Sequence, residues 1–172
     1  PDFWRPGLPY LDQLTIRVLP DEQSRLAALR SGEVDGGTFS ADTALAVADD
    51  PSLTVLSGLI SAPRVLQFAI RDGEVPWSDV RVRQAINAAI DRQAIADNVF
   101  GGEAVLSGPV PPGYGDWFIP PEELAEDFYV HDPDRARTLL AEAGYADGFG
   151  LEILANPTPR EFVQTAEIIQ AQ

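Results

Sequence analysis

Residues 11–70 alternate between strand-like and helix-like patterns, and this alternation constrains the fold more than any other feature of the sequence. Polar and apolar residues take turns over residues 13–19, which places every second side chain on one face, as in a half-buried strand. Helix patterns follow, and each begins at a residue that can cap a helix N-terminus. Strands alternating with helices form an α/β layer, and we expect one here. The expected strands are residues 13–19, 34–35, 53–56 and 65–70, and the apolar face of the first is Leu14, Ile16 and Val18.

Helix boundaries are marked by capping residues along the whole chain. Asp21 and either Ser40 or Asp42 are expected to begin the two early helices, and Gly32 ends the first. After residue 76 the pattern becomes mainly helical, with Ser78 as the expected N-cap of a helix over the following residues. The remaining signals are Asp91 and Asp132-Pro133 as helix starts, Gly101 and Gly144 as helix ends, a strand over 151–154, and Pro159 as the start of a last helix.

Composition excludes several classes of function. The 172 residues carry 27 acidic and 12 basic side chains, for a formal net charge of −15, and every base is arginine. A surface this acidic would repel nucleic acid and anionic membranes, so neither is an expected partner. There is no cysteine, which removes disulfides, thiolate metal sites and thiol nucleophiles. There is no methionine either, and the last helical pattern is unfinished at Gln172, so we expect an internal piece of a longer protein.

Four stretches, taken together in their order and spacing, resemble one family of proteins. They are residues 26–35 (LAALRSGEVD), 76–92 (PWSDVRVRQAINAAIDR), 108–111 (GPVP) and 132–145 (DPDRARTLLAEAGY). They are similar to the oligopeptide-, dipeptide- and nickel-binding proteins that serve ABC importers, the extracellular solute-binding proteins of family 5. The second stretch is the most specific of the four, and together they cover nearly the whole chain.

The resemblance implies a fold, a division of the chain and a set of partners. It implies a part of a two-lobed, type II periplasmic-binding-protein-like α/β fold, truncated at both ends. The late part of the first lobe would occupy residues 1–64, a crossing strand at the lobe junction residues 65–71, and the opening part of the second lobe residues 72–172. The implied partners are a small solute, such as a peptide, and the membrane permease of the importer. The implied location is extracytoplasmic, with a lipid-anchored parent protein, and no cofactor is implied.

Two short segments are candidates for contact with the solute. Residues 37–40 follow a strand pattern and precede a helix, where crevices and free backbone N–H groups attract ligands, and the candidates there are Thr38, Phe39 and Ser40. The other interpretation of this segment is an ordinary turn with Phe39 in the core. Ala69 and Arg71 share a face of the expected crossing strand. The family usually has asparagine at the position of Arg71, so the hinge or the class of solute is expected to differ from the common one.

The sequence offers no complete catalytic or metal site. The charged residues around Asp79 are better explained by helix capping and ion pairing than by catalysis. The acidic residues 122–127 lack the spacing of a calcium loop and are expected to begin a solvated helix. His131 is the only histidine, so neither a metal cage nor a serine–histidine–aspartate set can be assembled without it.

Three functions therefore remain open, and the first is our main prediction. It is a non-catalytic substrate-binding component of an ABC importer for peptides or a related solute. The second is a small hydrolase with paired carboxylates, which needs two carboxyl groups about 5–9.5 Å apart in one pocket. The third is a structural or adaptor domain without a small ligand. Because apolar faces would be uncovered, the isolated piece is also expected to self-associate.

Overall fold

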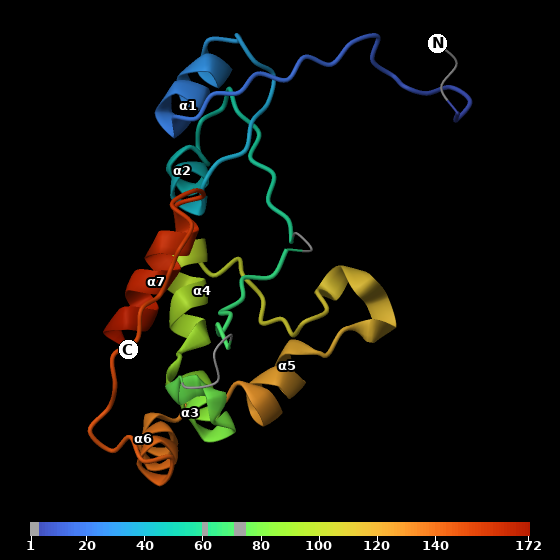
Figure 1. Cartoon of the computed structure of the whole chain (residues 1–172). Helices are drawn as coiled ribbons and strands as arrows, with labels where there is room; N and C mark the ends of the chain where they lie inside the picture. The colour runs from blue at the N-terminus through green and yellow to red at the C-terminus, as the bar shows by residue number, and fades with distance from the viewer. Residues whose placement is uncertain (1–3, 60–61, 71–74) are drawn as a thin grey trace.

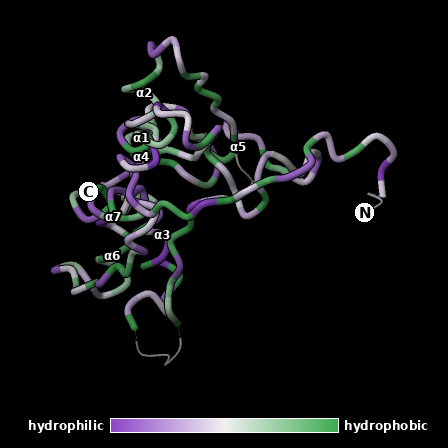
Figure 2. Tube along the Cα trace, turned by 90° about the horizontal axis from the view of Figure 1, so that it is seen from above, coloured by the Kyte–Doolittle hydropathy of each residue, from purple (hydrophilic) through white to green (hydrophobic). Residues whose placement is uncertain are grey.

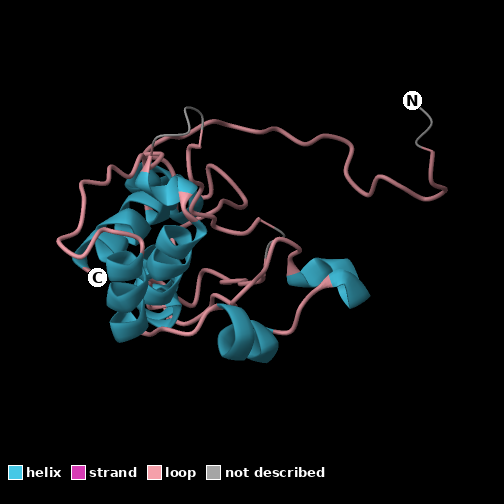
Figure 3. Cartoon of the chain, turned by 60° about the horizontal axis from the view of Figure 1, so that its bottom comes forward, coloured by secondary structure: helices cyan, strands magenta, loops and turns pink. Residues whose placement is uncertain are grey.

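The computed structural model describes residues 4–59, 62–70 and 75–172, and all regular structure in these ranges is helical (Figure 3). The two early helices are α1 (Glu22–Arg30) and α2 (Ala41–Ala46). The later α-helices are α3 (Val80–Ala89), α4 (Arg92–Phe100), α5 (Pro121–Glu123), α6 (Pro133–Glu142) and α7 (Glu161–Ala171). Two 3₁₀-helices, η1 (Pro76–Ser78) and η2 (Pro112–Trp117), and one π-helix, η3 (Leu124–Phe128), complete the set.

The helices begin mostly where the capping residues predict. The carboxylates of Asp21, Asp91 and Asp132 accept the backbone N–H of the residue three positions on, and each caps its helix as expected. Ser40 is the N-cap of α2, which decides between the two predicted candidates. Each of these side chains satisfies an N–H group that has no partner within the helix.

Three expectations about local structure are wrong. Ser78 lies within η1 and the N-cap of α3 is Asp79, because the Pro76-Trp77 turn takes up one more residue than expected. The last helix starts at Glu161 and not at Pro159. The third concerns the proline-rich loop, which the sequence predicts to be pinned to a core by its apolar residues Trp117, Phe118 and Ile119. Phe118 and Ile119 are half-buried, but the Trp117 side chain is 81% exposed.

The expected strands are also absent from the part of the chain that the structure describes. Residues 13–19, 34–35, 53–56, 65–70 and 151–154 are assigned to no strand. A strand exists only where a second backbone segment supplies the hydrogen-bonded ladder. The predicted apolar face of the first segment stands in solvent, with Leu14, Ile16 and Val18 exposed by 73%, 81% and 86%. Figure 2 shows hydrophobic residues along these open stretches as well as in the helices.

The core lies between the helices of the second half of the chain. Helices α3 and α6 make the most extensive contact of any two elements described, around the buried small side chains of Ala85, Ala88 and Ala136. Leu139 and Leu140 of α6 pack against this cluster, as their helical spacing predicts. Small residues let the two helix backbones approach closely, so α3 and α6 pack tightly against each other as the α3–α6 pair.

The other helices extend this pair into an elongated body (Figure 1). Helix α7 returns alongside α4, and α2 contacts α4 in turn, which connects the early helices with the later ones. The stretch before α1 runs away from the helices. Within the described ranges, no helix has the length and apolar character that crossing a bilayer requires.

Candidate functional site

The candidate segment 38–40 is tied to α1 by its serine. Glu22 of α1 accepts the backbone N–H of Ser40 at 2.6 Å and its hydroxyl at 3.3 Å. Partial burial raises the pKa of Glu22, but the hydrogen bonds from Ser40 and Thr43 outweigh it and hold the pKa below its ordinary value. The Ser40 hydroxyl also caps α2 by accepting the N–H of Thr43 at 3.3 Å. Ser40 therefore already has protein partners for its backbone N–H and its hydroxyl.

Phe39 and Thr38 differ in their surroundings. The ring of Phe39 is half-buried, and the guanidinium carbon of Arg25 lies 5.9 Å from its centroid. Arg25 is itself held by the backbone carbonyls of Leu19 and Pro20, at 2.7 and 2.9 Å. Thr38 is exposed, so it is the member of this segment most open to a ligand. Phe39 therefore has the packing role of an ordinary turn residue, whereas Thr38 faces solvent, as a residue that contacts a ligand would.

The second candidate segment is attached elsewhere. The carbonyl oxygen of Ala69 accepts the indole N–H of Trp77 at 2.7 Å. Arg71 lies outside the described residues. Phe39 and Ser40 thus contact α1, and Ala69 is fixed to the turn before α3. That these residues face one solute cleft stays a prediction.

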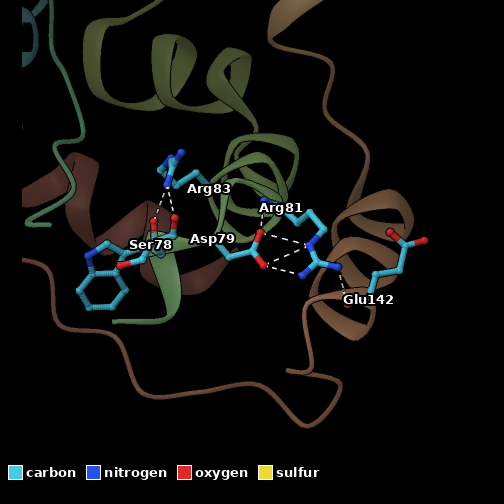
Figure 4. Close-up of polar contacts among 6 residues, drawn as sticks. Ser78, Asp79, Arg81, Arg83 and Glu142 are labelled. Carbon is cyan, nitrogen blue, oxygen red and sulfur yellow. Dashed lines mark hydrogen bonds and ion pairs between the residues drawn. The ribbon is translucent and has the colours of Figure 1, made fainter. Parts of the chain in front are cut away.

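The charged residues around the most specific motif form a structural network, as Figure 4 shows. Asp79 caps α3 through the backbone N–H of Arg81, and its carboxylate accepts the Arg81 guanidinium. These hydrogen bonds lower the pKa of Asp79 to about 2. Arg83 donates to the carbonyls of Trp77 and Ser78 at 2.7 and 2.9 Å, and so holds η1 against α3. The network joins the backbone of η1 to that of α3, and its acid and bases are already paired with one another or with backbone groups.

A groove between α3 and residues 127–130, with Arg135 of α6 at one end, was missed by the sequence reasoning. It has a volume of about 350 Å³, and Asn87 at its wall donates to the carbonyl of Phe128 at 2.6 Å. The positions on α3 are spaced by three and four residues, and a search for a polar helix face would have found Arg83, Gln84 and Asn87 among them. The lining residues are Val80, Arg83, Gln84, Asn87, Ala88, Asp127, Phe128, Val130 and Arg135.

Arg92 is a further structural residue that the sequence reasoning did not single out. Its guanidinium carbon lies 4.2 Å from the ring centroid of Tyr129, and it donates to the backbone and side chain of Asn87. Burial lowers its pKa from the ordinary arginine value. A stacked and hydrogen-bonded arginine of this kind joins the start of α4 to the loop before α6.

No metal cluster emerges from the described residues. None of their polar or charged side chains is fully buried, although several, such as Arg92, are half-buried. His131 lies 3.8 Å from the carboxylate of Asp91, and both side chains are more than a third exposed. No group of three histidine or acidic residues converges within the same ranges. The acidic residues 122–127 form the start of α5 and η3, as predicted.

Comparison with known proteins decides the family. Residues 1–172 match the family described as "Bacterial extracellular solute-binding proteins, family 5 Middle". The chain belongs to this family. The resemblance recognised in the four sequence stretches is therefore confirmed.

Individual relatives agree with the family match. The chain is 34% identical to heme-binding protein A of Haemophilus influenzae, over 99% of this chain and 31% of that protein. It is 34% identical to the glutathione-binding protein GsiB of Salmonella choleraesuis, over 86% of this chain and 28% of that protein. It is 37% identical to a putative ABC transporter peptide-binding protein of Brucella ovis, over 84% and 26%. The chain thus spans about a third or less of the length of these relatives.

A solved structure confirms the fold. The chain is similar to the PBP AgaA in complex with agropinic acid, from Agrobacterium tumefaciens R10, with a TM-score of 0.59 and 29% identity. The match covers 88% of this chain and 30% of that one. The chain is therefore part of a two-lobed, type II periplasmic-binding-protein-like fold, as the resemblance implies.

Proposed function

We propose that this chain serves in the non-catalytic substrate-binding component of an ABC importer for peptides or a related small solute. The single observation that supports this most is the match to family 5 over all 172 residues. The relatives carry names that refer to heme, glutathione and peptides, and the similar structure holds agropinic acid. These names share a small-solute ligand and differ in its chemical class.

The arrangement of the helices supports a receptor more than an enzyme. In the most specific motif, Asp79 caps α3 and Arg83 holds the preceding turn, so these charges already have structural partners. The charged group near His131 is the partly exposed carboxylate of Asp91. A hydrolase would need an acid and a base held at a shared pocket with pKa values pushed apart. The one carboxyl group whose pKa departs far from its ordinary value is Asp79, among the described residues, and its partner is an arginine. No observation favours the hydrolase or adaptor alternatives.

We further propose that the first lobe ends near residue 64 and that a junction segment over 65–71 leads to the second lobe. The solute would lie between the lobes, near Thr38 and Ala69, with Phe39 and Ser40 as support, and Arg71 stays a candidate from the sequence. Solute receptors gain affinity by closing two walls around the ligand. The extracytoplasmic location, the lipid anchor and the permease partner belong to the same proposal.

The proposal is tested with the full-length gene product and a panel of solutes. We would measure thermal unfolding in the presence of reduced glutathione, trialanine, hemin and agropinic acid, each at increasing concentration. Ligands that bind only the folded state raise the melting temperature progressively with concentration. A dose-dependent rise with at least one compound supports the receptor. Flat curves with all four, together with hydrolysis of any of them, would refute it.

The position of the cleft is tested separately. Thr38→Tyr places a larger side chain in the proposed opening and should weaken binding of whichever panel solute raises the melting temperature. Asp42→Asn, two residues into α2, is the matched control and should leave binding unchanged. Equal binding by both variants would show that Thr38 lies away from the solute.

A further inference from the structure

The segment over residues 62–70 is attached to the later helices at two separate points. At its C-terminal end, the indole N–H of Trp77 donates to the carbonyl of Ala69 at 2.7 Å. Near its N-terminal end, the guanidinium carbon of Arg64 lies 4.4 Å from the ring centroid of Phe162 in α7. The segment has no assigned strand or helix of its own, and these two side-chain contacts hold it against the later helices.

The backbone of Trp77 is itself held against α3. It lies in η1, and its own carbonyl accepts the Arg83 guanidinium at 2.7 Å. Arg83 belongs to α3, whose contact with α6 is the most extensive in the described chain. The position of the Trp77 backbone therefore follows that of α3.

The Trp77 ring also faces the end of α6. It lies 6.4 Å from the ring of Phe149, which in turn contacts Tyr145 edge-on at 5.1 Å. The backbone N–H of Tyr145 donates to the carbonyl of Leu140 at 2.8 Å, and so connects the aromatic group to the end of α6. Trp77 thus connects the open segment to α3 through Arg83, and to α6 through the aromatic residues that follow it.

The early helices use different anchors. Helix α1 is joined to segment 38–40 by the Glu22–Ser40 hydrogen bond and the Arg25–Phe39 contact. The contacts that fix Arg64 and Ala69 go instead to Phe162 and Trp77, which follow the segment in the chain.

We infer that Trp77 is a positioning residue that fastens residues 62–70 to the α3–α6 pair, so that this segment moves with the later helices and not with α1 and α2. In terms of the proposed function, on which this reading of the two halves as lobes rests, the junction segment is carried by the second lobe. Ala69 would reach the solute together with the second lobe, while Thr38 would reach it with the first.

The first test measures the Trp77 hydrogen bond in the 172-residue chain, without any solute. Indole N–H signals are followed by NMR after ¹⁵N labelling of tryptophan, and their exchange with solvent is compared. Trp117 is the reference, because its side chain is 81% exposed. A hydrogen bond of ordinary net strength should slow exchange at Trp77 by about three- to tenfold relative to Trp117. Equal exchange rates would overturn the inference.

The second test measures whether the segment moves with the later helices. The chain has no cysteine, so pairs of spin labels can be placed freely through Val65→Cys with either Asp134→Cys on α6 or Gln23→Cys on α1. Dilution with unlabelled chain removes distances between copies. We expect a narrower distance distribution for the pair 65 and 134 than for the pair 65 and 23.

Variants test whether the Trp77 indole N–H is the cause of the narrow 65–134 distance distribution. Trp77→Phe keeps an aromatic ring and removes only the N–H donor, and it should widen the 65–134 distribution toward that of the 65–23 pair. Trp117→Phe is the matched control and should change neither. An unchanged 65–134 width in a folded Trp77→Phe chain would overturn the inference. If that variant fails to fold, the exchange rates of the unmodified chain still decide. Neither test uses solute binding, so failure here leaves the proposed function to its own experiment.

Discussion

The Asp79 carboxylate accepts three hydrogen bonds from the Arg81 guanidinium, two from Nε at 3.1 Å and one from Nη2 at 2.6 Å. The same arginine donates through Nη1 to the backbone carbonyl of Glu142, at the end of α6, at 2.7 Å. The N-terminus of α3 is therefore linked to the C-terminus of α6 by two residues of the most specific sequence motif (Figure 4). The motif that identifies the family has a structural role in this chain.

Removing the cap should cost more stability than removing the charge. Asp79→Ala loses the acceptor for the N–H of Arg81 and the ion pair, and we expect the melting temperature to fall by about 2–4 °C. Asp79→Asn keeps a capping acceptor, so its melting temperature should fall by less. Thermal unfolding followed by circular dichroism at neutral pH measures both. A larger loss in the asparagine variant would mean that the charge and not the cap stabilises α3.

The same ion pair predicts a pH dependence. Hydrogen bonds from Arg81 lower the pKa of Asp79 from 3.8 to about 2, so ionised Asp79 favours the folded state. Because the folded-state pKa is the lower one, this stabilisation is fully present above pH 3.8 and is lost as the pH falls toward 2. The stability difference between the unmodified chain and Asp79→Asn should therefore shrink over this interval. A difference that stays constant down to pH 2 would contradict the assignment.

The fully buried residue of α3 should be sensitive to truncation. Val82 is 0% exposed, whereas Val80, two positions earlier on the same helix, is 52% exposed. Val82→Ala removes buried methyl groups and leaves a cavity, which should cost about 2 kcal/mol of unfolding free energy. Val80→Ala is the matched control and should cost less than about 0.5 kcal/mol. Similar losses in urea unfolding of the two variants would show that α3 packs on a different face.

Exposed apolar positions predict self-association of the isolated chain. Leu14, Ile16 and Val18 alternate along residues 13–19 and stand in solvent without a strand partner. An uncovered apolar edge favours pairing with another chain, and at physiological salt the net charge of −15 is screened beyond about 8 Å. We expect dimers or larger species at high concentration in sedimentation velocity, and fewer of them for Ile16→Glu. A strict monomer at every concentration would reject this prediction.

Capping and helical spacing are the parts of the structure that sequence reasoning predicts well. Asp21, Ser40 and Asp91 begin helices because each satisfies a backbone N–H within its own neighbourhood, so the nearby residues contain the whole cause. The facing residues of α3 and α6 are likewise set by the local period.

Strands and the site depend on distant groups and are harder to predict. The alternation at residues 13–19 describes a face that needs covering, but a ladder needs a second strand at a defined register. The Trp77–Ala69 bond has no signal in the sequence, because it depends on how η1 turns back on the segment before it. For Thr38, the pattern gives the loop position, and the assignment to a solute cleft stays a prediction.

We expect the full-length protein to bind its solute and to leave it chemically unchanged. Isothermal titration calorimetry of the full-length gene product, with the panel solute that raises its melting temperature most, tests this directly. We predict saturable binding of one solute per protein, followed by recovery of that solute intact when the mixture is denatured and analysed by mass spectrometry. Absence of saturable heat, or recovery of a cleaved or modified solute, would contradict the claim.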